Sequence, residues 1–135
     1  MFCYCAQSRR IARALTARYD AALAKANLTA GQFETLGVLQ SLNGGSGSAL
    51  AQRLAVDKTT LSRNLKPLIE AKLVTARRGE QDAREIRYAL SAAGQRRLAK
   101  AMPLWQAAHA QTETLLGKQA AGMERALQTA SALLA

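Results

Sequence analysis

Hydrophobic positions divide the chain into helical and strand-like segments, the first of which is a helix over residues 5–26. Four apolar side chains in this segment recur at steps of four residues: Ile11, Leu15, Tyr19 and Leu23. That spacing places side chains on one face of an α-helix. A second helix is predicted to begin at Thr29, because Thr29 and Gln32 have the spacing of a capping box.

Two short helices are predicted after a glycine-rich loop at residues 43–47. The first extends from Ser48, its expected N-cap, to Leu54. The second has Asp57 as its N-cap and an apolar face with four residues: Leu61, Leu65, Leu68 and Ile69. Another face carries four polar residues: Thr59, Ser62, Arg63 and Lys66. Because the apolar face continues past Pro67, we expect this proline to kink the helix rather than end it.

Alternating apolar and polar residues predict two strands, at residues 73–77 and 85–90, which are joined by a charged hairpin tip at residues 78–84. Ser91 is then expected to cap a long helix, which Pro103 bends. After a break at residues 117–122, a last amphipathic helix begins at Met123. The pattern therefore predicts a single, mainly α domain with a small β-hairpin.

Positive charge is concentrated in the middle of the chain. The 135 residues include 19 Lys and Arg against 9 Asp and Glu, which gives a net charge of +10. Residues 53–100 hold twelve of the basic residues and five of the acidic ones, a net of +7. This imbalance favours a polyanionic partner. Aromatic residues make up only 4% of the chain, which leaves little surface on which single-stranded bases can stack.

The order short helix, tight turn, second helix and basic hairpin is typical of a winged helix-turn-helix. A helix of this kind fits the DNA major groove, and a basic hairpin can reach phosphates or the minor groove. The residues predicted to contact DNA lie on the second helix and the hairpin: Lys58, Thr59, Thr60, Ser62, Arg63, Lys66, Arg77, Arg78, Arg84 and Arg87. The alternative is that the polar side of this helix is an ordinary solvated surface.

This region resembles the MarR-type family of transcription regulators. The resemblance is carried by four stretches: Leu50 to Leu68, Leu73-Val74, Asp82-Ala83-Arg84, and Leu90-Ser91-Ala92-Ala93-Gly94. It implies a homodimer with dimerisation helices at residues 1–28 and 92–135 and a winged helix-turn-helix DNA-binding part at residues 29–91. It also implies a recognition helix over Asp57–Ala71. A wing arginine, Arg84, would be held by a salt bridge to Asp82 and aimed at the minor groove.

The resemblance further implies a function. Members of this family usually repress transcription at palindromic operators in double-stranded DNA, and many release the DNA when a small aromatic or phenolic acid binds. The sequence is therefore interpreted as a dimeric repressor with such a ligand. The apolar faces of the end helices independently favour a second copy of the chain, although these helices could instead pack on each other.

Two other functions stay open. Cys5 begins the first helix 14 residues before Tyr19, a spacing found in the branch of this family that senses organic hydroperoxides. Arg9 and Ala30 stand where that branch has two further tyrosines. Cys5 is therefore either a redox site or an inert thiol near a frayed terminus. The second alternative is a basic RNA- or ribosome-associated structural protein.

Several classes of protein are not expected. No run of 18 or more apolar residues and no signal peptide is visible, so we expect a cytoplasmic protein. His109, the only histidine, has no evident nucleophile beside it in the sequence, and an enzyme is therefore not expected. It is interpreted as a structural histidine or as part of a pocket wall. Cys3 and Cys5 lack further ligands, so neither a metal nor another cofactor is expected.

Overall fold

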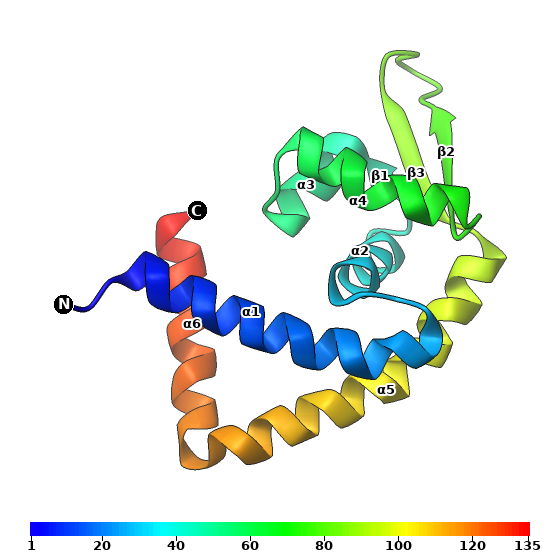
Figure 1. Cartoon of the computed structure of the whole chain (residues 1–135). Helices are drawn as coiled ribbons and strands as arrows, with labels where there is room; N and C mark the ends of the chain where they lie inside the picture. The colour runs from blue at the N-terminus through cyan, green and yellow to red at the C-terminus, as the bar shows by residue number, and fades with distance from the viewer.

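The computed structural model describes residues 1–135 as a helical chain with one small sheet (Figure 1). Its α-helices are α1 (Tyr4–Leu23), α2 (Ala30–Ser41), α3 (Gly47–Leu54), α4 (Lys58–Glu70), α5 (Ala92–Leu116) and α6 (Ala120–Leu134). Two 3-10 turns, η1 (Ala24–Ala26) and η2 (Gly117–Gln119), follow α1 and α5. The strands are β1 (Gly45–Ser46), β2 (Val74–Arg78) and β3 (Ile86–Leu90). The predicted fold class, mainly α with a β-hairpin wing, is confirmed.

Side-chain caps explain where the helices of the middle segment begin. The Gln32 N–H donates to Thr29 Oγ1 over 3.2 Å, and the Thr29 N–H donates to Gln32 Oε1 over 2.9 Å, so the predicted capping box is present. The N-cap of α3 is Ser46, which accepts a hydrogen bond from the Ala49 N–H over 3.2 Å. The prediction of Ser48 was wrong, because the two residues of β1 pair with β3 and the helix starts directly after them.

The sheet has three antiparallel strands in the order β1-β3-β2. In the hairpin, Val74 pairs with Leu90 at the base and Arg78 pairs with Ile86 near the tip. β1 was not predicted, because the glycine-rich sequence around it has the composition of a loop. Figure 1 shows the hairpin projecting beyond the helices, as a wing does.

Both prolines lie inside continuous helices. α4 extends without a break through Pro67, and α5 extends without a break through Pro103. Pro67 is exposed, so the ring adds no bulk to the core, although the carbonyl of Arg63 loses its helical partner. The prediction that α4 is one helix is therefore confirmed, and α5 changes direction along its course in Figure 1.

The hydrophobic core lies where α2, α3, α4, the base of the wing and the first half of α5 meet. Its fully buried side chains are nearly all leucines, among them Leu36, Leu39, Leu50, Leu65 and Leu98. Gly94 lets α5 pack closely on this core, since a Cβ at this position would overlap the carbonyl oxygen of Leu73. The start of α5 is thereby fixed at the base of the wing.

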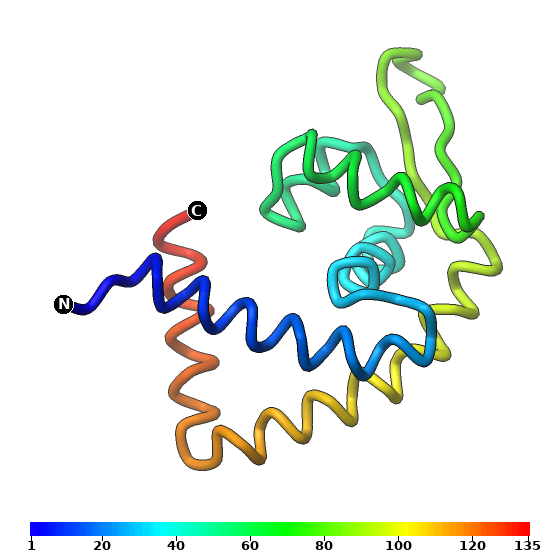
Figure 2. Tube along the Cα trace, in the orientation of Figure 1, coloured from blue at the N-terminus to red at the C-terminus, as the bar shows by residue number.

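The two end segments extend away from this core. α1 and α5 pack along each other, and α6 turns back from the far end of α5 (Figure 2). No residue of α6 is buried, and its main neighbour is the short turn η2. None of the helices combines the length and the hydropathy that are needed to cross a membrane.

Candidate nucleic-acid interface

α4 presents two chemically different faces. Leu61, Leu65 and Leu68 are buried in the core. Five of the predicted contact residues on this helix are exposed and a sixth, Thr60, is half-buried; the exposed ones are Lys58, Thr59, Ser62, Arg63 and Lys66. Because the leucines fix the rotation of the helix, the polar face points outward as a rigid row of hydrogen-bond donors. Such a row can contact base edges and phosphates.

Asp57 fixes the first turn of this helix. The Thr60 N–H donates to an Asp57 carboxylate oxygen over 2.7 Å. This bond holds the pKa of Asp57 below its usual value, and the Thr60 hydroxyl and the positive charge of Arg63 lower the pKa further. The cap therefore contributes stability above the ordinary carboxyl pKa, and this contribution is lost as the pH falls through the lowered pKa. At neutral pH the Asp57 carboxylate is therefore ionised and accepts the hydrogen bond that caps α4.

The wing carries the other predicted contacts. Arg77, Arg78, Arg84 and Arg87 are all exposed, and Arg77 lies directly opposite Arg87 in the register of β2 and β3. Like charges at directly opposed positions destabilise a strand pair. Glu85 offsets only part of this repulsion, through an ion pair with Arg87 in which Nη1 and Oε1 are 3.0 Å apart. The wing is therefore a surface on which a bound anion would relieve repulsion.

The tip of the wing differs from the expected arrangement of Asp82 and Arg84. The Asp82 carboxylate accepts a hydrogen bond from the backbone N–H of Arg84 over 2.9 Å, and the two side chains form no ion pair. An aspartate in a tight turn readily accepts from the backbone two residues later, which competes with pairing to a side chain. The guanidinium of Arg84 is consequently free of any intramolecular ion pair.

α4 and the wing lie next to each other. A shallow hollow of about 330 Å³ separates them and is lined by Ser62, Leu65, Lys66, Ile69, Glu70 and Tyr88. Tyr88 comes from β3 and pairs with Ala76 of β2. Ser62 and Lys66 of α4 thus face Tyr88 of the wing across this hollow, and the wing arginines lie outside it. The molecule therefore has two neighbouring basic elements, α4 and the wing, that could bind a single extended polyanion.

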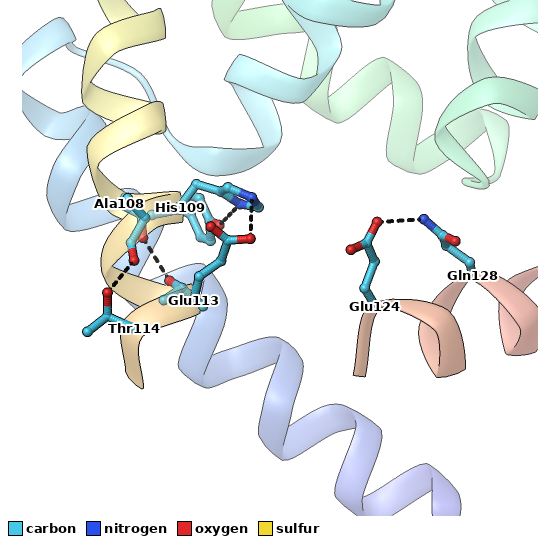
Figure 3. Close-up of polar contacts among 9 residues, drawn as sticks. Ala108, His109, Glu113, Thr114, Glu124 and Gln128 are labelled. Carbon is cyan, nitrogen blue, oxygen red and sulfur yellow. Dashed lines mark hydrogen bonds and ion pairs between the residues drawn. The ribbon is translucent and has the colours of Figure 1, made fainter. Parts of the chain in front are cut away.

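A second group of functional candidates lies where α1, α2 and α5 meet. The Tyr19 hydroxyl hydrogen-bonds to His109 Nδ1 over 3.1 Å, and the His109 ring stacks on Trp105 with ring centroids 4.9 Å apart. Phe33 of α2 stacks on the same tryptophan at 6.0 Å. His109 Nε2 also lies 3.8 Å from Glu113, one turn further along α5 (Figure 3). His109 therefore belongs to an aromatic cluster between the end helices and the winged helix-turn-helix.

The two cysteines lie at the start of α1. Cys3 is the N-cap residue and Cys5 is in the first turn, and both thiols are free and exposed. Tyr19 is 14 residues after Cys5 on the same helix, a separation of about 21 Å, so the two side chains do not meet within one chain. The exposure of its thiol is a feature that favours a redox role for Cys5. No group of three His, Cys, Asp or Glu side chains is arranged to hold a metal ion.

Comparisons with known proteins give a consistent result. Residues 26–85 match the sequence model of the MarR family. Among solved structures, the M. tuberculosis transcriptional regulator MosR in complex with DNA is 36% identical, with a TM-score of 0.86 over 98% of this chain and 96% of that chain. Among curated protein sequences, none matches significantly.

More distant structures share the fold. The S. aureus MepR–DNA complex is 21% identical, with a TM-score of 0.83 over the whole of both chains. B. bronchiseptica BpsR, whose DNA binding is regulated by 6-hydroxynicotinic acid, is 20% identical, with a TM-score of 0.85 over 96% of this chain and 93% of that chain. At these identities the likeness concerns the fold alone.

Proposed function

The chain belongs to the MarR family of transcription regulators, and from this premise we propose that it is a homodimeric repressor of palindromic operators. In this proposal, residues 29–91 bind double-stranded DNA and residues 1–28 and 92–135 hold the dimer together. A small aromatic ligand releases the repressor from its operator.

The observation that carries the proposal is the outward polar face of α4. A helix held by three buried leucines on one side and exposing Thr59, Ser62, Arg63 and Lys66 on the other can enter the major groove without disturbing the core. The arginines of the wing would then meet phosphates or the minor groove. Two copies related by a two-fold axis would place two such helices at half-sites about 34 Å apart.

Selection from a pool of random-sequence DNA duplexes tests this proposal. We expect the bound fraction to converge on a palindrome whose half-sites are about one helical turn apart. Structured RNA added in excess should compete no better than random duplex DNA. Convergence on a single asymmetric motif, or preferential capture of the RNA, would contradict the proposal and favour the RNA-associated alternative.

Arg84→Ala tests the proposed role of the wing. Because the Arg84 guanidinium has no ion-pair partner within the chain, we expect its removal to leave the melting temperature nearly unchanged. The operator affinity should fall, and its log–log dependence on salt concentration should flatten by roughly one unit. The measurement is a salt titration of binding beside a thermal melt. A lowered melting temperature with an unchanged salt slope would make Arg84 a structural residue of the hairpin.

The exposed apolar surface of α6 supports the homodimer. Leu127, Leu133 and Leu134 are 50%, 78% and 86% exposed, and the main neighbour of α6 within the chain is the short turn η2. The polar contact on this helix, from Gln128 Nε2 to Glu124 Oε1 over 3.1 Å, is local and joins adjacent turns (Figure 3). Apolar surface of this kind on a regulator of this family is best explained by a second copy of the chain.

The aromatic cluster supports the proposed ligand. A groove of about 340 Å³ lies between α1 and α5, and its lining includes the residues just before Tyr19 and His109 of the cluster. The lining residues are Arg18, Ala21, Ala22, Ala108, Gln111 and Thr112. The volume of the groove suits a small molecule, three of its six lining residues are alanine, and the Arg18 guanidinium could pair with a carboxylate. An aromatic acid bound there would contact α1 and α5, one residue away along each helix from Tyr19 and His109 of the aromatic cluster.

Trp105 gives a direct readout of such binding, because it is the only tryptophan. We expect benzoate, used as a minimal aromatic acid, to change the Trp105 fluorescence and to weaken binding to the selected operator over the same concentration range. Arg18→Ala should shift both titrations to higher concentration. Weakened DNA binding with unaltered fluorescence in both proteins would contradict a ligand site at this junction.

A further inference from the structure

Asp20 makes a side-chain hydrogen bond across the boundary between α1 and α2, which are otherwise connected by η1, by residues 27–29 and by packing. It lies in the last turn of α1 and is half-buried. One of its carboxylate oxygens accepts a hydrogen bond from the backbone N–H of Ala30, the first residue of α2, over 2.7 Å. This is the one hydrogen bond between α1 and α2, and it crosses the boundary between the end helices and the winged helix-turn-helix.

The contact is well suited to hold α2 in one orientation. The capping box of Thr29 and Gln32 leaves the Ala30 N–H without a partner from its own helix, and Asp20 supplies that partner from outside. A carboxylate at a helix N-terminus is also favoured by the helix dipole. The start of α2 is therefore tied to α1 by a short, charge-assisted hydrogen bond.

Contacts on neighbouring elements limit movement in other directions. Phe33 stacks on Trp105 and joins α2 to α5, and Tyr19, the residue before Asp20, joins α1 to His109 of α5. Aromatic stacking tolerates sliding and small rotations, whereas a 2.7 Å hydrogen bond constrains distance and direction. Among the contacts at this junction, the one made by Asp20 is thus the most sensitive to the angle between α1 and α2.

That angle has a large effect at the recognition helix. α2 has 12 residues and is therefore about 18 Å long. A rotation of about 5° at its start moves its far end by about 1.6 Å, and two protomers that move in opposite directions change the separation by about 3 Å, close to the 3.4 Å rise of one base pair. α3 and α4 both pack on α2 and move with it.

We propose that Asp20 is a positioning residue that sets the distance between the two recognition helices of the dimer, and hence the half-site spacing that the protein accepts. The proposal rests on the proposed function of a dimer bound to a palindrome. It assigns Asp20 no contact with DNA and no part in the dimer interface. Its effect is on the register of the two half-sites and not on the bases read within each half-site.

Selection from random-sequence duplexes, repeated with variants, tests this role. The wild-type chain is expected to select one spacing. Asp20→Ala should select the same half-site motif over a spread of spacings, and its affinity for the wild-type spacing should fall by about tenfold, the size expected for a lost cap. Asp20→Asn keeps an acceptor oxygen in the same position and should restore the single spacing. Glu34→Ala removes an exposed carboxylate of α2 and serves as the matched control.

The outcomes distinguish a failure of the proposed function from a failure of the role of Asp20. A wild-type chain that selects no palindrome overturns the proposed function itself. A wild-type chain with one spacing, together with an Asp20→Ala chain that keeps the same single spacing, overturns the role of Asp20 alone. If Asp20→Ala does not fold, Asp20→Glu decides the question, because it keeps the charge but moves the acceptor by one methylene group. It should shift or broaden the spacing, and an unchanged spacing overturns the proposal.

Discussion

A chain that lacks residues 123–135 is expected to sediment as a monomer at micromolar concentration and to bind the selected palindrome about a hundredfold more weakly than the full chain. The loss follows from avidity, because two linked DNA-binding parts bind about a hundredfold or more tighter than either part alone. The deletion removes the apolar face of α6, which includes Met123, Leu127 and Leu134. Binding to a single half-site should change little.

The deletion should remove most of α6 without disturbing the hydrophobic core. No residue of α6 is buried within the chain, so the truncated protein should keep its core and its helical content. Leu127→Glu should reproduce the dissociation by placing a charge on the apolar face. Ala132→Glu adds the same charge on another face of the helix, away from Leu127, Leu133 and Leu134, and serves as the control. A truncated chain that remains as dimeric as the full one would show that α6 is not part of the interface.

Arg63→Ala is expected to cost about 1–3 kcal/mol on the selected operator and to relax the preference for bases at one position in each half-site. Arg63 lies on the exposed face of α4, one turn after the capped first turn, and none of its atoms is held by an ion pair. Its fork of donors can bind a guanine edge with two hydrogen bonds, which few other side chains can do.

A charge-matched control separates base recognition from the general electrostatic attraction between an arginine and DNA. Arg96→Ala removes an exposed arginine from α5, outside the proposed interface, and should leave the selected motif intact. Affinities of both variants for the operator and for random duplex DNA should be measured at the same salt concentration. An equal loss on the two DNAs for Arg63→Ala would mean that Arg63 contacts a phosphate and reads no base.

Local signals in the sequence account for most of what could be predicted. The capping pair at Thr29 and the cap at Asp57 each depend on residues within one turn of helix, and both form as expected. The exposed face of α4 follows from the spacing of its leucines. The wing follows from the alternation before Leu90, because side chains in a strand alternate between two faces.

Contacts between distant residues could not be predicted in this way. β1 forms only because Gly45 and Ser46 meet β3 some forty residues later, and nothing in their own composition indicates a strand. The bond from Ala30 to Asp20 depends on the angle between two helices. At the wing tip, sequence alone could not decide whether Asp82 binds the Arg84 backbone or its guanidinium, because both lie within reach of the carboxylate.

We expect two copies of this chain to bind one palindrome, with one α4 in each half-site. Native mass measurement of the complex tests it most directly, on the selected duplex and on a duplex with one half-site scrambled. We expect two chains on the intact duplex and an affinity about a hundredfold lower on the scrambled one. One chain per intact duplex, or equal affinity for the two duplexes, would contradict it.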